Sequence, residues 1–536
     1  MKSKVDCVLV GHNELVLRDY EKKLRYMGTN TPTYRDFNLG IIKYKGEQYT
    51  AADMLNVLCE GTEFTENGQF RWDDIFSLAI ACIATYLDKS NISFDFIAEF
   101  QSGKDKLKDI IENCEVLTVG VITTFCTIAE PIIEVVRFIR SLKADVKIIV
   151  GGPYVSGEVR SKSDEFISNH FHQIGADYYI NSPQGEDTLV KIVECIKECK
   201  LIDKIPNIYY KDNDRYIYTF SENENNALEG NVVNWHLFSS QIRSTVSVRT
   251  ARSCPFSCSY CAFPQHAGKF ETASCEHVEK EFKLLNEIEG LNYVNIIDDS
   301  FNVPMNRFKD ILKMKINNNY DFKWNSFIRC QYLDEESVIL MKDSGCEGVF
   351  LGIESANQNI LDIMEKKADV NQYIRGLELL KKHGIITYAS FIFGIPGETK
   401  ESIYDTINFI RDYQPDFYRI QLWFCDPITP IWKKREEYGL EGTNFSWRHN
   451  TMSISEAQSY IEKAFIEINE SIWLPQFNFD FTAIFNLLNR GMGLQQIKRY
   501  IRVFNEGVRN KLLSGDMLSD NISEKMLNEM KDVFKA

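Results

Sequence analysis

Residues 254–261 read Cys-Pro-Phe-Ser-Cys-Ser-Tyr-Cys. The three thiols of this run belong to Cys254, Cys258 and Cys261. The run follows an apolar segment at 247–251 that predicts a β-strand, so the cysteines share one loop beyond the strand's carboxyl end. Three closely spaced thiolates can hold three corners of a cuboidal iron–sulfur cluster and leave one iron open to a small molecule. A zinc site completed by His266 or Cys275 is the alternative.

Alternating strands and helices continue after this loop. Apolar runs predict further strands at 292–297, 322–328, 348–353, 388–393 and 417–424. Helical periodicity predicts helices at 276–289, 304–314, 335–344, 357–364, 371–383 and 400–413. Six βα units are too few for a closed eight-unit barrel, which needs roughly 250 residues. The sequence therefore predicts a partial (β/α)6 barrel over residues 246–435.

A second α/β region precedes the barrel. Short apolar strands are expected at 5–11, 93–97, 116–122, 146–150 and 177–180. This alternation predicts an open, doubly wound, Rossmann-like sheet over 1–200, whose ligands bind beyond the carboxyl ends of its strands. We expect residues 18–70 to form an insertion in that domain, and the polar residues 201–245 to form a linker with a small hairpin. Residues 436–536 predict a C-terminal all-α region.

The cysteine run, with Tyr260 before its last cysteine, and the six βα units resemble the radical S-adenosylmethionine (SAM) superfamily. The resemblance implies a [4Fe-4S] cluster held by the three cysteines, with SAM chelating the open iron through its amino and carboxylate groups. It also implies that SAM is cleaved to a 5′-deoxyadenosyl radical, which abstracts a hydrogen atom from the substrate. A flavodoxin- or ferredoxin-type electron donor is implied as a partner.

The same resemblance assigns SAM-binding positions at the ends of the predicted strands. They are Tyr260, Asp298, Asp299, Arg329, Glu354, Ser355, Ile392 and Gly394. The paired aspartates suit the SAM ammonium, Arg329 its carboxylate or ribose, and Glu354 a ribose hydroxyl. Backbone around Gly394 would meet adenine, because glycine permits close approach. An aspartate capping helix 304–314 and a surface position for Arg329 are the structural alternatives.

The N-terminal region resembles the cobalamin-binding domain found in front of such barrels. The positions that would line the corrin ring are Thr123, Thr124, Gly151, Gly152 and Pro153. The D-x-H-x-x-G motif of proteins that supply a histidine to cobalt is missing, and only His12 falls on the loop after the first strand. We therefore expect cobalamin without a histidine ligand, and His12 as a lower ligand is the alternative.

Together these resemblances imply a cobalamin-dependent radical SAM methyltransferase of class B, acting on an unactivated carbon or phosphorus centre of a natural-product or peptide substrate. A radical must remove hydrogen from such a centre, and methylcobalamin can then supply the methyl group. The N-terminal and tail segments look closest to the phosphinothricin-pathway P-methyltransferases. Candidates for substrate contact in the tail are Trp447, Arg448 and His449, with core packing as the alternative. The alternative activity is a cobalamin-dependent radical cyclisation or rearrangement without methyl transfer.

Composition limits the remaining classes of function. The chain has 536 residues, with 61 Lys and Arg against 76 Asp and Glu and a formal net charge of −15, which argues against a nucleic-acid partner. No apolar run approaches the roughly 20 residues that cross a bilayer, and no secretion signal opens the chain, so we expect no membrane association and a cytoplasmic enzyme. Fourteen cysteines in so large a chain indicate metal ligands or buried thiols, not a disulfide scaffold. An RNA methylthiotransferase would need further N-terminal cluster cysteines and a basic tail, and a cofactor sensor would leave the open iron without a purpose.

Overall fold

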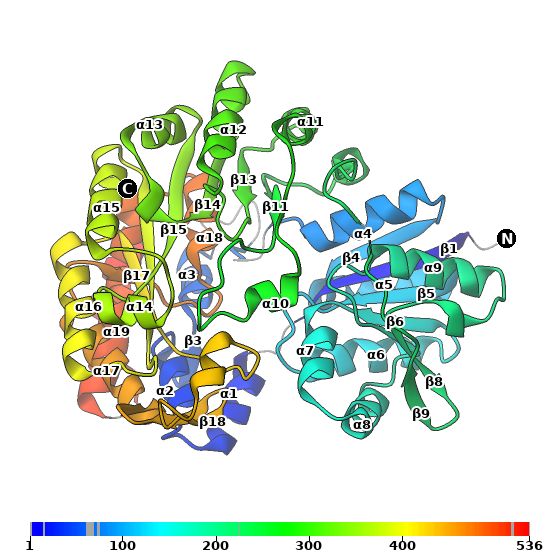
Figure 1. The fold of residues 1–536 in the computed structure, drawn as a ribbon, viewed down its shortest axis with the longest axis horizontal. Coiled ribbons are helices and arrows are strands. Elements are labelled where there is room, and N and C mark those ends of the chain that lie inside the picture. Colours follow the sequence, from blue (N-terminus) through cyan, green and yellow to red (C-terminus); the bar gives the residue numbers. More distant parts are fainter. Residues whose placement is uncertain are drawn as a thin grey trace. The chain divides into compact units, whose positions relative to one another are not determined.

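The chain forms two compact units in a computed structural model. The first contains Met1–Leu17, Phe76–Gln241 and His266–Gly268, and the second contains Arg18–Ile75, Ile242–Gln265 and Lys269–Ala536. The structure describes residues 3–13, 17–60, 69–71, 75–224, 226–515 and 519–534. Each unit is built around its own seven-stranded sheet (Figure 1).

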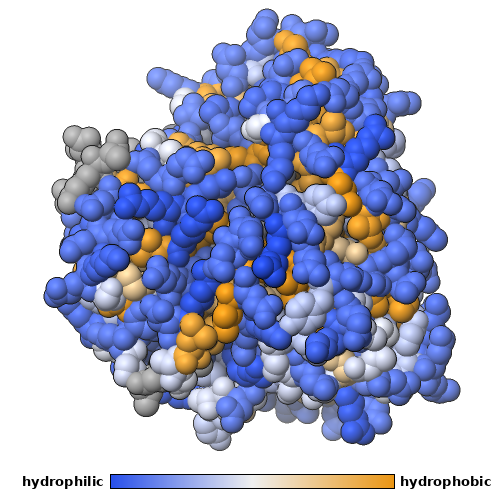
Figure 2. All heavy atoms as spheres, turned by 90° about the vertical axis from the view of Figure 1, so that its left-hand side faces the viewer, coloured by the Kyte–Doolittle hydropathy of each residue, from blue (hydrophilic) through white to orange (hydrophobic). Residues whose placement is uncertain are grey.

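The surface shown in Figure 2 is mostly hydrophilic, with scattered apolar patches. Within the described ranges, no helix combines the length and apolar character that crossing a bilayer would require.

The sheet of the first unit is the doubly wound sheet that the sequence predicts. Its strands are β1 (Lys4–His12), β4 (Phe94–Glu99), β5 (Glu115–Ile122), β6 (Lys147–Gly151), β7 (Tyr178–Ile180), β8 (Ile208–Asp212) and β9 (Arg215–Tyr218). They lie in the order β4-β1-β5-β6-β7-β8-β9, and the first five are parallel. The chain moves outward from β1 to β4 and then returns to β5, so the winding reverses between β1 and β5. Ligands of such sheets bind at this switch point.

Helices cover both faces of this sheet (Figure 1). Those of the first unit are α4 (Leu78–Lys89), α5 (Phe100–Asn113), α6 (Glu130–Leu142), α7 (Pro153–Ser161), α8 (Asp164–Ile174) and α9 (Glu186–Lys197). Alternate residues such as Val8 and Val10 of β1 enter one core layer with Ile110 of α5, Ile139 of α6 and Phe171 of α8. This period of two is what a strand buried on both faces requires.

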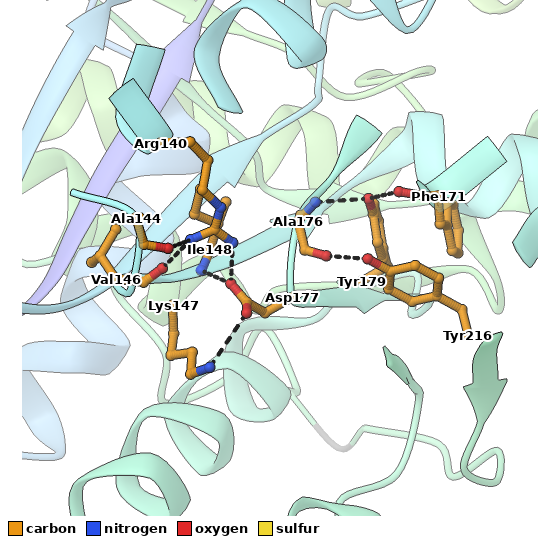
Figure 3. A network of polar contacts seen from close by, with 10 residues as sticks. All are labelled: Arg140, Ala144, Val146, Lys147, Ile148, Phe171, Ala176, Asp177, Tyr179 and Tyr216. Atoms are coloured by element: carbon orange, nitrogen blue, oxygen red, sulfur yellow. Dashed lines mark hydrogen bonds and ion pairs between the residues drawn. The ribbon is translucent and has the colours of Figure 1, made fainter. Parts of the chain in front are cut away.

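The small hairpin expected within residues 201–245 is present as β8–β9, but it extends this sheet and is not part of a linker. Tyr216 of β9 donates its hydroxyl to the carbonyl of Ala176 at 2.5 Å (Figure 3). The same figure shows Asp177, before β7, accepting hydrogen bonds from Arg140 at 2.5 Å and from the amide of Ile148 at 2.8 Å. Short antiparallel strands of four or five residues carry too little periodicity to reveal this pairing in the sequence.

The second unit contains the six predicted βα units. Its strands are β10 (Thr245–Val248), β13 (Tyr293–Ile296), β14 (Lys323–Ile328), β15 (Cys346–Glu354), β16 (Ile386–Phe393), β17 (Phe417–Leu422) and β21 (Ile472–Trp473). All neighbouring pairs are parallel, and β10 and β21 form the two edges, so the sheet is an open barrel. The intervening helices are α11 (Cys275–Asn286), α12 (Met305–Asn317), α13 (Glu335–Asp343), α14 (Gln358–Ile363), α15 (Val370–Lys382) and α16 (Lys400–Tyr413). Around the cysteine loop lie β11 (Ala251–Arg252), α10 (Phe263–Ala267) and β12 (Glu271–Thr272).

The segment expected as an insertion in the N-terminal domain belongs instead to the second unit. It contains α1 (Leu17–Met27), α2 (Pro32–Asn38), β2 (Ile42–Tyr44), β3 (Glu47–Tyr49) and α3 (Ala51–Cys59). Lys511 donates to the carbonyls of Asn38 and Ile41 at 2.8 and 2.5 Å, and Tyr500 donates to that of Ala51 at 2.6 Å. These partners lie more than 440 residues away in the sequence, where no local pattern could indicate them.

The C-terminal region is not all-α as expected. It contains the small antiparallel sheet β18 (Glu441–Thr443), β19 (Ser446–His449) and β20 (Met452–Ser453), and it adds β21 to the barrel sheet. Its helices are α17 (Ile454–Glu467), α18 (Phe481–Asn489), α19 (Leu494–Ser514) and α20 (Glu524–Asp532). Phe485 of α18 stacks on Tyr293 of β13, and Phe481 stacks on Tyr388 of β16, so this helix spans the open barrel. The strands have two to four residues, too few for a periodic signal.

Candidate active site

The cysteine loop lies between β11 and α10 and is anchored by main-chain contacts. The amide of Ser259 donates to the carbonyl of Met364 at 2.8 Å, and its hydroxyl donates to that of Ile363 at 2.7 Å. Cys258 is buried, whereas Cys254 and Cys261 are half-buried. Burial, with the neighbouring thiols, raises the pKa of Cys261 to about 11. In the described part of the chain, no three Cys, His, Asp or Glu side chains converge to hold a single metal ion. The loop offers three thiols on one short, anchored segment.

Arg329, just beyond β14, lies against the cysteine loop and not at the surface. It is only 6% exposed, and its Nη2 donates to Cys258 Sγ at 3.3 Å. Its Nη1 donates to the carbonyl of Lys366 at 3.0 Å, and the guanidinium carbon lies 3.5 Å from the ring centroid of Phe256. Asn302 exchanges two side-chain hydrogen bonds of 2.9 Å with the Arg329 backbone. The surface position is therefore excluded, and the guanidinium holds a positive charge at a cysteine thiol.

Glu354 ends β15 with a strained backbone and a firmly held carboxylate. Its φ of +67° is in the left-handed region that non-glycine residues rarely adopt. Oε1 accepts from the Tyr260 hydroxyl at 3.1 Å and from Lys366 Nζ at 2.9 Å. A Cβ at Gly352 would lie 2.7 Å from Oε1 and 3.4 Å from Lys366 Nζ, so a side chain there would displace the carboxylate from this position. Both donors use Oε1, which leaves Oε2 for a ligand as far as the described residues show.

The two aspartates after β13 are not equivalent. Asp298 is buried and accepts from the Thr250 amide and hydroxyl at 2.6 and 2.5 Å and from the Ala251 amide at 2.9 Å, so it holds the entry to the cysteine loop. Asp299 is exposed to solvent, yet enough protein surrounds it that desolvation, with the Asp298 carboxylate, raises its pKa to about 7. The N-cap of α12 is Pro304, so neither aspartate caps that helix. Of the two, Asp299 has the more exposed side chain.

Gly394, beyond the end of β16, is covered by the tail segment. Its φ is +100°, and a Cβ would lie 2.3 Å from Trp447 Cη2. Trp447 stacks on His449, whose Nε2 lies 3.1 Å from the Gly394 carbonyl oxygen, and burial lowers the pKa of His449. Arg448, on the other side of β19, is exposed and forms a 2.7 Å ion pair with Glu441. The structure thus brings Trp447 and His449, but not Arg448, to the predicted adenine segment.

Three further side chains of this region are buried or half-buried. Ile392 is half-buried in β16, and Ser355 is buried, with its hydroxyl 3.5 Å from that of Thr406. Glu398 is buried, accepts from the Gly394 amide at 2.6 Å, and has a pKa that burial raises to about 8. Helix α16 is capped by Thr399 in a capping box with Ser402, and Glu398 holds the turn at Gly394 instead.

Sequence reasoning missed Lys366 and Asn302. Lys366 lies 12 residues after Glu354, and Asn302 lies 27 residues before Arg329. Neither residue is part of a motif. A buried lysine close to two predicted site residues becomes visible only in the fold.

In the first unit, the predicted cobalamin positions lie beyond β5 and β6, beside the switch point. Thr123 is buried and donates its hydroxyl to the Gly151 carbonyl at 2.9 Å. Gly152 has a φ of +118°, and a Cβ there would lie 2.7 Å from Thr123 Oγ1. Thr124 and Pro153 are exposed. His12 ends β1, and its ring meets the exposed Phe125 edge to face at 5.4 Å.

Comparisons with known sequences agree with this geometry. Residues 248–410 match the family model of the radical SAM superfamily. An uncharacterised methyltransferase, PH0819, of Pyrococcus horikoshii is 26% identical over 332 residues, which cover 59% of this chain and 69% of that protein. An anaerobic magnesium-protoporphyrin IX monomethyl ester cyclase of Rubrivivax gelatinosus is 28% identical over 201 residues, 36% of each chain. The match thus spans about a third of the cyclase.

Solved structures share the fold. The radical SAM methyltransferase TsrM of Kitasatospora setae, with tryptophan and a SAM analogue bound, has a TM-score of 0.54 at 19% identity and covers 67% of this chain and 72% of that chain. The cobalamin-dependent SAM radical enzyme OxsB, with aqua-cobalamin and SAM bound, has a TM-score of 0.56 at 15% identity and covers 88% of this chain and 77% of that chain. These findings confirm the predicted fold class and the prediction of an enzyme. Residues 248–410 therefore form a radical SAM domain, and the chain shares its fold with TsrM and with the cobalamin-dependent OxsB.

Proposed function

We propose that this enzyme uses a [4Fe-4S] cluster, SAM and cobalamin to methylate an unactivated carbon or phosphorus centre of a natural-product or peptide substrate. The observation that carries the proposal is the three-cysteine loop of a radical SAM domain, with a buried arginine against its central thiol. The methyltransferase relative and the shared fold with cobalamin-dependent enzymes support it.

The donor set fits a cluster. When bound, the cluster supplies the electron that cleaves SAM, and cobalamin carries the methyl group. Cys254, Cys258 and Cys261 would hold the cluster as thiolates, which are costly to bury without compensating charge. The Arg329 guanidinium at Cys258 Sγ supplies a positive charge and a hydrogen bond at the right place.

Residues around the open iron corner would hold SAM. Asp299 is the available anion for an ammonium group, and Glu354 Oε2 is the available acceptor for a ribose hydroxyl. Glu398 fixes the turn at Gly394 through its amide, which shapes the backbone expected to face adenine. Trp447 covers the other side of that turn and keeps water from it.

The first unit would hold cobalamin along its small-residue edge. Gly151 and Gly152 keep side chains away from the carboxyl end of β6, and the Thr123 hydroxyl is committed to the Gly151 carbonyl. A flat ring can approach such an edge closely. The expectation of cobalamin without a histidine ligand rests on the missing D-x-H-x-x-G motif, and His12, whose ring meets Phe125, is the alternative.

The cluster assignment is tested with protein reconstituted anaerobically with iron and sulfide. Wild-type protein is expected to bind about four irons per chain, and Cys258→Ala to lose the cluster spectrum. Cys275→Ala is the control, since Cys275 is half-buried at the start of α11 and is the ligand that a zinc site would use. Tightly bound zinc that Cys275→Ala releases would contradict the assignment.

Methyl transfer is tested by product analysis with a flavodoxin-type donor or a chemical reductant. Methylation predicts S-adenosylhomocysteine alongside 5′-deoxyadenosine, and a substrate heavier by one methylene unit. The cyclase relative favours the second candidate, a radical cyclisation or rearrangement. That activity would yield 5′-deoxyadenosine without S-adenosylhomocysteine.

A further inference from the structure

We propose that Lys366 is a positioning residue of the SAM site, which holds the Glu354 carboxylate ready for the ribose of SAM. This inference rests on the proposed function. Lys366 is 5% exposed, and its Nζ lies 2.9 Å from Glu354 Oε1 and 3.1 Å from the Tyr260 hydroxyl. The three groups form a closed triangle, because the Tyr260 hydroxyl also donates to Oε1 at 3.1 Å.

A buried ion pair of this kind is poor evidence for a role in stability alone. The side chains of Lys366 and Glu354 keep only 6% and 11% of their surface exposed, so both charges have lost most of their hydration. Replacement of such a pair by apolar side chains is often neutral or stabilising. A role in orienting a functional group accounts for the charges better.

The hydrogen bonds of this triangle hold the Glu354 carboxylate in one orientation. Both donors use Oε1, the backbone of Glu354 is already strained at a φ of +67°, and Gly352 leaves no side chain in the way. Rotation of the carboxylate would break two hydrogen bonds at once. Oε2 is therefore held in place before a ligand arrives, where it can accept a hydrogen bond from a hydroxyl.

The main chain around Lys366 accepts hydrogen bonds from residues of and beside the cysteine loop. The Lys366 carbonyl accepts from Arg329 Nη1 at 3.0 Å, and the Ile363 and Met364 carbonyls accept from Ser259. A change in the Lys366 side chain leaves these carbonyls in place. Loss of the ammonium should therefore weaken SAM binding but spare the cluster.

The test compares Lys366→Met with Lys367→Met in the full-length, reconstituted protein. Lys367 is the next residue and is exposed, so it controls for a general loss of positive charge. SAM affinity is measured by equilibrium dialysis, and the cluster by iron content and by EPR of the reduced protein without SAM. We expect Lys366→Met to weaken SAM binding at least about tenfold, as for a lost hydrogen bond between charged groups. Lys367→Met should bind like wild type, and both variants should keep the wild-type iron content and spectrum.

A double-mutant cycle with Glu354→Gln tests the route of the effect. If Lys366 acts through the carboxylate, Lys366→Met should cost less than twofold in SAM affinity when residue 354 is already glutamine. Three results would each overturn this inference and leave the proposed function standing. They are SAM binding by Lys366→Met within twofold of wild type, additive effects in the cycle, and loss of the cluster in Lys366→Met. Wild-type protein that assembles no cluster and binds no SAM would overturn the proposed function with it.

Discussion

Replacing Gly394 by alanine tests whether the tail segment packs on the predicted adenine turn. The new Cβ would lie 2.3 and 2.5 Å from two ring carbons of Trp447 and 3.4 Å from the Ala457 Cβ. Trp447 is 3% exposed and donates its indole N–H to the Trp423 carbonyl at 3.0 Å, so it cannot move aside freely.

Two free-energy costs add in Gly394→Ala. An L-residue in left-handed backbone costs about 1–2 kcal/mol, and overpacking a close-packed site costs about 1–3 kcal/mol. Gly491 separates them, because it has a φ of +91° with nothing within 4 Å of its Cβ position. Gly491→Ala should carry the backbone cost alone. Gly394→Ala should therefore lower the free energy of unfolding by about 1–3 kcal/mol more than Gly491→Ala.

The assay is urea denaturation followed by tryptophan fluorescence, which reports on this unit because Trp324, Trp423 and Trp473 are buried within it. Adding Trp447→Ala should remove the overpacking cost from Gly394→Ala but leave its backbone cost. Equal urea midpoints for Gly394→Ala and Gly491→Ala, or an equal effect of Trp447→Ala on both variants, would refute this packing of Trp447 on Gly394.

Three other variants probe buried charges. Burial lowers the pKa of Lys511 to about 7, so the folded chain binds fewer protons than the unfolded chain between pH 7 and about 10.5. The free energy of unfolding of the wild-type protein should therefore rise over this pH range, as measured by urea midpoints. That of Lys511→Met should not rise. Burial raises the pKa of Glu398 to about 8, so the folded chain binds more protons than the unfolded chain between about pH 4.5 and pH 8. The free energy of unfolding of the wild-type protein should therefore fall over this pH range. An equal fall in Glu398→Gln would show that this carboxyl is not its source. Arg329→Met removes the cation at Cys258 Sγ and should make the cluster's reduction potential more negative in an EPR titration, whereas an unchanged potential would deny this arginine any electrostatic effect on the cluster.

The barrel was predictable because parallel strands buried on both faces appear as continuous apolar runs. All six strands lie within three residues of their expected bounds. Helices α7 and α8 were missed, since glycine and polar residues in 153–174 obscure their periodicity. The place of residues 18–75 could not be predicted, because the contacts of Asn38 and Ala51 are made with the far end of the chain.

At the site, the sequence located residues but not the directions of their side chains. Asp298 and Arg329 do follow strands at the expected edge. Asp298 nevertheless turns to the Thr250 backbone, and Arg329 turns to Cys258 and Lys366. Which neighbour takes a charged group depends on what the fold places beside it, and spacing along the chain carries no such information.

The membership of residues 18–75 in the second unit has a consequence for how the protein is made. A ribosome releases this segment early, yet Tyr500 and Lys511, to which it binds, emerge several hundred residues later. During most of translation this segment therefore lacks the residues that it contacts in the folded protein. Cutting the gene between residues 241 and 242 would therefore yield a C-terminal fragment that lacks three of its own helices, so the two units cannot be produced separately by a single cut.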